Sequence, residues 1–232
     1  MRQGLGQLFR TGLIALAVVG LWAGWALGAD PSPKEVNLKK AEEIFKASLR
    51  SDDLERNRQY LRQILDLAPN SPYGHFSKGW FFAQDEKYAQ AIVEYREAVV
   101  EKPDFSEARH NLASAYFYSG EIQKAIAEFK KVIELSPLWA EAHLNLGTAY
   151  FLGNEPFAAI AQYERTLQLN PRLLITHYYI GLVLDRMGRW SEAHEHYSAF
   201  LQVDAGADLR EYADRARNRL GEIWVLIGHQ AT

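Results

Sequence analysis

Histidine is the residue of this sequence best suited to chemistry, because a neutral imidazole binds metal ions and exchanges protons near neutral pH. Seven histidines occur among the 232 residues, whereas cysteine is absent. Histidine also recurs at one position of a repeated pattern, in His75, His143 and His177, and Arg109 holds the remaining copy. A metal site would need these recurring side chains to meet around one ion.

The spacing of the histidines argues against such a site. If equivalent helices have a second helix between them, contacts of about 8 to 10 Å place the recurring histidines roughly 16 to 20 Å apart. Zinc binds nitrogen at about 2.0 to 2.1 Å. His194 and His196 lie two residues apart on a predicted helix, where side chains point about 200° away from each other. We therefore expect no metal, no cofactor and a packing role for the recurring histidines.

No motif of an enzyme accompanies the histidines. The sequence contains no phosphate-binding glycine loop, no nucleophile elbow and no metalloprotease motif. The absence of cysteine also removes a thiolate nucleophile and a disulfide framework. Residues 208–232, which follow the last repeat, leave no room for a separate catalytic domain. We therefore expect that the protein is not an enzyme.

The elements that position these side chains recur at a fixed interval along the sequence. When residues 140–173 are placed beneath residues 106–139, Pro171 falls under Pro137 and no gap is needed. Each copy has a small residue on its first helix, an alanine on its second helix and an aromatic residue four positions after that alanine. The copies are Gly79, Ala113, Gly147 and Gly181, then Ala91, Ala125, Ala159 and Ala193, then Tyr95, Phe129, Tyr163 and Tyr197.

These residues and their period resemble the tetratricopeptide repeat, a helix-turn-helix unit of about 34 residues. The resemblance implies an all-α fold, a right-handed superhelix of such repeats with a C-terminal capping helix. One helix pair cannot cover its own apolar face, so neighbouring repeats must bury it. The small residues are expected where the backbone of a second helix approaches the first helix closely.

The domain organisation follows from the register of the repeats. Residues 1–29 are predicted to be a signal peptide or an N-terminal membrane anchor, residues 30–37 a linker, and residues 38–71 a divergent capping repeat. The four clear repeats are 72–105, 106–139, 140–173 and 174–207, and a capping helix and tail follow at 208–232. Gly120, Gly153 and Gly188 are expected to end first helices in the left-handed conformation.

The N-terminal segment has the order of charges and apolar residues that is typical of an export signal. Arg2 and Arg10 precede an uncharged run over residues 11–29. Small residues near Ala29 would serve for cleavage; left uncleaved, the run nearly covers the roughly 30 Å of bilayer hydrocarbon. Either alternative places the repeats on the far side of the membrane from the arginines. We therefore expect an exported protein, periplasmic or on the extracytoplasmic face of a membrane, anchored or free.

The composition excludes a further class of partner. The chain is 48% hydrophobic and 24% charged, as expected for a globular protein. Its net charge of -3 becomes -5 without residues 1–29, because 24 basic and 29 acidic residues then remain. A mildly acidic body argues against a nucleic-acid partner, which requires a basic surface.

One face of each first helix is predicted to line the inner surface of the superhelix. This face is mostly apolar or aromatic, and a contiguous surface of that kind usually marks a binding site. The resemblance implies that asparagines at the position shared by Asn111 and Asn145 hold a peptide main chain. The predicted peptide-binding groove comprises Tyr73, Phe76, Trp80, His110, Asn111, Tyr118, Leu144, Asn145, Thr148, Tyr178 and Leu182.

Parts of this face have an alternative interpretation. Phe117, Phe151, Leu152 and Ile175 fit packing against the next repeat equally well, and an asparagine can instead join two turns. Some tetratricopeptide domains bind a terminal carboxylate through lysine and arginine on this face, but here uncharged residues hold those positions. An apolar or aromatic protein segment, helical or extended, therefore fits the groove better.

Two functions are compatible with these observations. The leading hypothesis is a protein-binding adaptor or scaffold of the cell envelope. The second is self-assembly into a homo-oligomer through the final helix, because Val225 and Leu226 lie beyond the apolar face that this helix needs for its own packing. The membrane would be a further partner, through residues 11–29, if that segment stays uncleaved.

Overall fold

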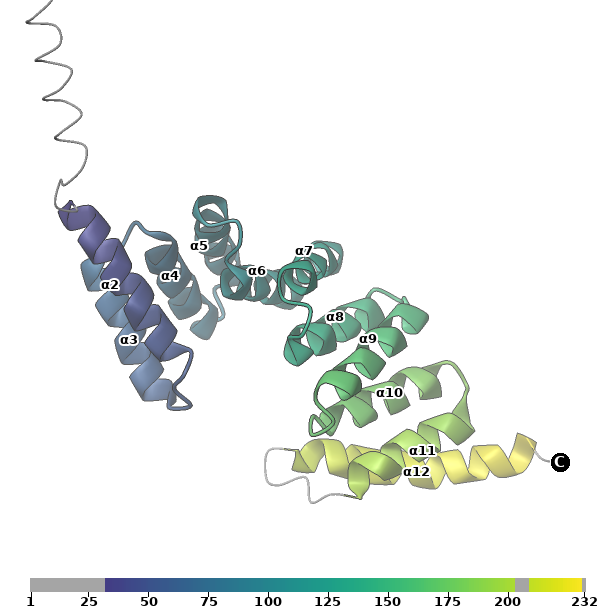
Figure 1. Cartoon of the computed structure of the whole chain (residues 1–232). Helices are drawn as coiled ribbons and strands as arrows, with labels where there is room; N and C mark the ends of the chain where they lie inside the picture. The colour runs from purple at the N-terminus through teal and green to yellow at the C-terminus, as the bar shows by residue number, and fades with distance from the viewer. Residues whose placement is uncertain (1–31, 203–208, 231–232) are drawn as a thin grey trace, which may run out of the picture. The chain divides into compact units, whose positions relative to one another are not determined.

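A computed structural model describes residues 32–202 and 209–230 of the chain, which contain eleven helices and no strand (Figure 1). The chain divides into two compact units, residues 1–68 and residues 69–232. The predicted all-α architecture is confirmed. The predicted N-terminal signal or anchor at 1–29 lies outside the described residues, as does the end of the last repeat at 203–207.

The first unit contains a pair of helices, α2 (Pro33–Ser48) and α3 (Leu54–Leu67). The Ser32 hydroxyl accepts a bond from the Glu35 backbone N–H, and the Glu35 carboxylate accepts one from the Ser32 N–H. This reciprocal cap, with a proline in the first helical position, starts a helix strongly. The linker predicted for residues 30–37 is therefore helical from Pro33 onwards. Two prolines suggested a linker, but the second one begins a helix.

The second unit is a solenoid in which each helix packs on the next one along the chain (Figure 1). One antiparallel pair of helices lies within each of the ranges 72–105, 106–139, 140–173 and 174–207. The helices are α4 (Pro72–Gln84), α5 (Tyr88–Glu101), α6 (Ser106–Tyr118), α7 (Ile122–Leu135), α8 (Ala140–Leu152), α9 (Pro156–Leu169), α10 (Ile175–Arg186), α11 (Trp190–Leu201) and the capping helix α12 (Arg210–Gln230).

In the first, third and fourth repeats the glycine of the first helix faces the aromatic ring of the second helix. A Cβ placed on Gly79, Gly147 or Gly181 would lie 2.6 to 2.9 Å from the ring of Tyr95, Tyr163 or Tyr197. The four alanines of the second helices are completely buried beside these rings. Close approach is therefore the reason for the small residue, as predicted, and the group that approaches is chiefly a side chain rather than backbone.

The turns inside the four repeats share one geometry. The left-handed residue is Glu86, Gly120, Asn154 or Gly188, and successive positions in this set are one repeat apart. In the second repeat the Gly120 N–H bonds the Phe117 carbonyl and the Glu121 N–H bonds the Tyr116 carbonyl, and the other repeats have the same two bonds. This is the Schellman motif. The expectation for Gly153 is wrong, because Asn154 takes the left-handed conformation and Gly153 stays at φ -73.

Replacing Glu86 by glycine is expected to stabilise the protein by about 1 kcal/mol, because the left-handed conformation strains a residue with a Cβ and not a glycine. The melting temperature should rise by about 2 to 4 °C for a unit of this size. Gly120→Ala, at the equivalent turn, should lower it. Equal or opposite shifts in thermal unfolding would show that these turns carry no such strain.

The capping helix α12 closes the end of the solenoid by packing on α11. Ala213, Ala216 and Ile223 are its buried residues. Arg219 reaches α10 and donates two hydrogen bonds to the Asp185 carboxylate, at 2.6 and 2.7 Å. Tyr212 covers Tyr178 of α10, with ring centroids 5.2 Å apart. The helix therefore shields the inner face of the last repeat.

Across the two described ranges, no helix combines the length and the apolar character that crossing a bilayer requires.

Candidate functional site: a pocket on the inner face

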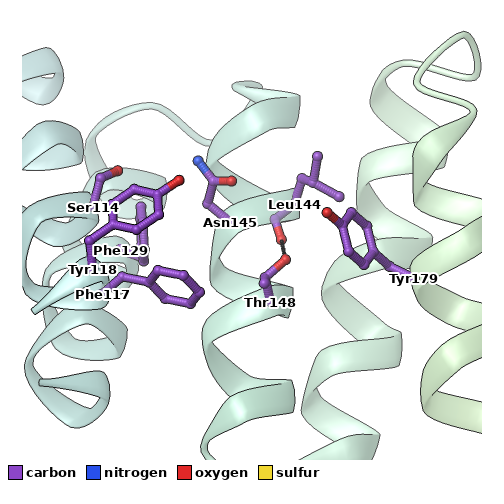
Figure 2. A pocket seen from close by; sticks show the side chains of 8 residues that line it. All are labelled: Ser114, Phe117, Tyr118, Phe129, Leu144, Asn145, Thr148 and Tyr179. Atoms are coloured by element: carbon purple, nitrogen blue, oxygen red, sulfur yellow. Dashed lines mark hydrogen bonds between the residues drawn. The ribbon is translucent and has the colours of Figure 1, made fainter. Parts of the chain in front are cut away.

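The first helices of three successive repeats surround a pocket of about 180 Å³ (Figure 2). We call it the central pocket. Helices α6, α8 and α10 provide its walls, and Phe129 of α7 lies at its base. The lining residues are Ser114, Phe117, Tyr118, Phe129, Leu144, Asn145, Thr148 and Tyr179. No charged side chain is among them, so the site suits an uncharged group.

Two hydroxyl groups of the lining, those of Ser114 and Thr148, are already engaged within the protein. Ser114 donates to the His110 carbonyl at 3.0 Å, and Thr148 donates to the Leu144 carbonyl at 3.1 Å. Thr148 also accepts a bond from the Tyr163 hydroxyl at 3.2 Å. Burial raises the pKa of Tyr163 to about 12, so this phenol stays protonated and donating. The polar groups left for a ligand are the side-chain amide of Asn145 and the hydroxyls of Tyr118 and Tyr179.

Asn145 is held by a histidine of the preceding repeat. Its Nδ2 lies 2.9 Å from Nε2 of His110. The His110 ring stacks on Trp139, with centroids 4.6 Å apart, and meets Phe129 edge-on. Burial lowers the pKa of His110, although a hydrogen bond that the ring donates to the Asn111 side chain and the charge of Glu141 act in the opposite direction. His110 is therefore expected to be neutral at pH 7.

This bond also corrects the spacing expected for the first helices. Side chains of α6 and α8 meet directly on the inner face, so equivalent helices are closer there than predicted. The prediction assumed that the second helix separates them everywhere. The first helices of neighbouring repeats instead touch directly: α4 with α6, α6 with α8 and α8 with α10.

The predicted groove residues fall into three groups. Tyr118, Leu144, Asn145 and Thr148 line the central pocket, and Tyr118 is 65% exposed at its edge. Others are partly accessible outside its lining: Trp80, His110, Asn111 and Leu182. The third group is buried at 4 to 6% exposure: Tyr73, Phe76 and Tyr178.

The buried group offers almost no surface to a partner, so its expected place in an accessible groove is wrong. Tyr73 and Phe76 pack against Phe105, which precedes the first helix of the next repeat, at centroid distances of 5.3 and 5.5 Å. Tyr178 lies between Phe200 of α11 and Tyr212 of α12. In each case a residue from a following element covers the ring. The sequence of the helix that carries the ring does not predict this burial.

Four lining residues are not among the predicted groove residues: Ser114, Phe117, Phe129 and Tyr179. Ser114, Phe117 and Tyr179 lie on the face of the first helices that is predicted to line the inner surface. Their position on that face could therefore have identified them as lining residues. Phe117 was open to either interpretation, and the structure places it in the pocket. Phe129, expected in the core, both fills the core and forms the pocket base.

The recurring histidine position joins the two helices of each repeat. Its residue always bonds the side chain 19 positions later: His75 with Glu94, Arg109 with Glu128, His143 with Gln162 and His177 with His196. The distances are 2.7 to 3.0 Å. The packing role predicted for this position is therefore a polar contact between the first and second helix.

In the fourth repeat both partners are histidines, with the two Nδ1 atoms 3.0 Å apart. One ring must donate and the other accept. Burial lowers the pKa of both side chains, and the charge of His177 lowers the pKa of His196 further, against the carboxylates of Glu195 and Glu192. A proton on both Nδ1 atoms would bring two N–H groups together and break the contact.

The fourth repeat is therefore expected to lose stability in acid. Since the folded pKa values lie below the unfolded value of about 6.5, the unfolded chain takes up protons first as the pH falls through that value. Stability is complete above it and is lost below it. His196→Gln, which copies the contact of His143 with Gln162, should reduce the difference between melting temperatures at about pH 7.5 and about pH 5.5. If the difference between the two melting temperatures is unchanged, the acid sensitivity comes from other groups.

Over residues 32–202 and 209–230, no three histidine, aspartate or glutamate side chains gather as a metal site would require.

Comparisons with known proteins agree with this architecture. Family models described as "Tetratricopeptide repeat" and "TPR repeat" match residues 42–104 and 113–153. No curated protein sequence matches significantly.

Solved structures resemble the chain more extensively. The crystal structure of MamA is 25% identical, with a TM-score of 0.57 over 70% of this chain and 92% of that one. YrrB, described as a TPR protein with an unusual peptide-binding site, is 15% identical, with a TM-score of 0.59 over 77% and 90%. The pilF protein of Pseudomonas aeruginosa is 16% identical, with a TM-score of 0.59 over 83% and 92%. The chain thus contains tetratricopeptide repeats and folds as a solenoid of the same kind as these proteins.

Proposed function

We propose that this chain is a non-enzymatic scaffold that holds an apolar or aromatic segment of another protein on the inner face of its repeats. The central pocket supports the proposal most directly. Its lining is uncharged, half of the lining residues are aromatic, and the pocket lies at the junction of three first helices. Tetratricopeptide repeats generally serve protein interaction, and the peptide-binding site in the description of YrrB is consistent with this use. At 15% identity the likeness to YrrB carries the fold and not the ligand.

We further propose that the scaffold works in the cell envelope, on the outer side of the cytoplasmic membrane. The support is the N-terminal sequence, in which Arg2 and Arg10 precede the uncharged run of residues 11–29. N-terminal sequencing of the mature protein would distinguish a cleaved signal from an anchor. A mature protein found only in the cytoplasm would contradict this location.

A charge placed in the central pocket is expected to abolish partner binding. Leu144→Arg puts a guanidinium in the uncharged lining of the pocket. A bound ligand would bury this charge without a partner, which is strongly unfavourable. The measurement is photo-crosslinking in native membranes from a benzophenone residue at position 118. The adduct formed by the parent protein should be reduced at least about tenfold in the variant, equivalent to about 1.4 kcal/mol.

The matched control is Phe157→Arg, at an exposed apolar residue of α9 that does not line the pocket. This control should leave the adduct unchanged. An adduct that survives Leu144→Arg, or that disappears equally in both variants, would reject the central pocket as the binding site.

Self-assembly is a second candidate function, and one observation favours it. Trp224 and Val225 of α12 are 69% and 57% exposed, although they belong to the helix that caps the solenoid. Apolar residues exposed side by side suit a contact with a second copy. Light scattering of the protein with and without residues 222–232 tests this, and a monomer in both samples would remove the idea.

A further inference from the structure

We infer that His110 positions the Asn145 amide so that the central pocket presents a hydrogen-bond acceptor, and that the bound protein segment supplies an N–H group there beside one uncharged, bulky side chain. The inference rests on the proposed function and adds the chemistry of the partner. His110 acts as a positioning residue, since it is outside the pocket lining and reaches the ligand through Asn145.

The orientation of the amide follows from the two atoms that meet. Both Nδ2 of Asn145 and Nε2 of His110 are nitrogens, 2.9 Å apart. An amide nitrogen donates and has no lone pair to accept with, so Nε2 must be the acceptor. His110 is then neutral, with its proton on Nδ1. The amide oxygen of Asn145 is left for the pocket, and Figure 2 shows it turned away from α6 while the nitrogen points towards that helix.

The His110 ring is fixed well enough to impose this orientation. It lies between Trp139, on which it stacks, and Phe129, which it meets at an interplanar angle of 66°. Aromatic contacts on two sides restrict rotation of the ring, so the acceptor at Nε2 stays in place.

The serine and threonine of the lining also favour a donor on the ligand, while the Tyr118 and Tyr179 hydroxyls can donate or accept. The Ser114 and Thr148 hydroxyl protons are bonded to backbone carbonyls of their own helices. Their oxygens and the Asn145 oxygen therefore face the pocket as acceptors. A peptide N–H satisfies such a group, whereas a carboxylate brings another acceptor and no proton.

The volume limits the apolar part of the ligand to one side chain. The pocket measures about 180 Å³. An apolar cavity of about 150 Å³ is large enough to hold benzene. One leucine or phenylalanine side chain therefore fits, next to a main-chain N–H that reaches Asn145. An aspartate or glutamate would be buried without a cation, because none lines the pocket.

The tautomer of His110 tests the positioning step without any ligand. Nitrogen-15 NMR of the full protein at neutral pH should show His110 protonated at Nδ1 and unprotonated at Nε2. A ring protonated at Nε2 would require the amide to turn over, with its oxygen towards His110, and would overturn the inference.

Two small probes test the chemistry of the partner. The first is N-acetyl-leucine N-methylamide, which has two N–H donors. The second is the same compound with both amide nitrogens methylated. Titration, followed through the methyl signals of the lining residues Leu144 and Thr148, should show the first probe binding about tenfold more tightly. A tenfold difference is the scale expected when one hydrogen bond is lost and its partner is left unsatisfied. N-acetyl-aspartate N-methylamide should not bind.

Two variants identify the origin of the preference. His110→Phe keeps an aromatic ring against Trp139 but removes the acceptor, and should reduce the tenfold preference to about twofold or less. Asn145→Leu removes the amide oxygen directly and should do the same, which keeps the inference testable if the first variant folds poorly.

Equal binding of the two leucine probes, or no binding of either, would overturn the inference. The proposed function would still be judged by crosslinking from position 118, which does not depend on these probes. Asn145 signals that shift on simple dilution of the protein would indicate a second copy in the pocket, and would overturn the assignment to a segment of another protein.

Discussion

Gly147→Ala is expected to destabilise the solenoid by about 2 kcal/mol and to lower its melting temperature by about 4 to 8 °C. The added Cβ would lie 2.6 Å from the Tyr163 ring and 3.2 Å from the Ala159 carbonyl. Tyr163 is completely buried, and its hydroxyl is tied to Thr148, so the ring cannot simply retreat. Overpacking of this kind outweighs the gain of about 1 kcal/mol that alanine brings to a helix interior.

The matched control is Gly221→Ala in α12, where a new Cβ would meet nothing within 4 Å. That variant should be stabilised by about 1 kcal/mol, from helix propensity alone. The second repeat suggests a rescue, because there Ala113 holds the position of Gly147 and Phe129, which lacks a hydroxyl, holds the position of Tyr163. Gly147→Ala with Tyr163→Phe should therefore cost less than the sum of the single changes, by about 1 kcal/mol. Strict additivity in thermal unfolding would show that the ring does not cause the penalty.

Arg219→Ala is expected to destabilise the C-terminal end by about 2 kcal/mol and to loosen α12. The change leaves the Asp185 carboxylate, 11% exposed, without the two hydrogen bonds that compensate its burial. Breaking a fully buried pair costs about 3 to 5 kcal/mol, and the value is lower here because Arg219 is one-third exposed. Hydrogen exchange should accelerate in α12, and Tyr178 should become more accessible as Tyr212 leaves it.

Arg217→Ala provides the control for this change. Arg217 pairs with Asp214 one turn away on the same helix, and both side chains are about 60% exposed. Such a pair contributes little, so a change within about 0.5 kcal/mol is expected. Equal effects of the two variants would mean that the contact between α10 and α12 does not hold the capping helix.

The regular period of the repeats was sufficient to predict the helices of the second unit. Two features of each repeat can be read directly from the sequence: the small residue of the first helix and the aromatic residue of the second helix. At Gly147 and Tyr163 both are visible in the printed residues, and their closeness requires no further knowledge. The same reasoning failed at Gly153 because glycine and asparagine both adopt the left-handed conformation, and the register, not the residue type, selects Asn154.

The pocket was less predictable, because burial depends on what covers a side chain. Tyr118 and Tyr178 are both aromatic residues on inner faces, but only Tyr178 is covered by α12. The contact between His110 and Asn145 joins residues 35 positions apart in two repeats. Whether those two side chains meet depends on the distance between the first helices of neighbouring repeats. The sequence of a single repeat does not specify that distance.

The polar contacts that join the helices of each repeat also bear on how the chain avoids pairing its helices wrongly. Because the four repeats are alike in their apolar residues, a first helix could otherwise dock on the second helix of any copy. The polar partners differ, however, and Arg109 would lose its carboxylate opposite Gln162 or His196. The contact of Arg109 with Glu128 therefore favours pairing of α6 with the helix next in the chain over pairing with α9 or α11 during folding.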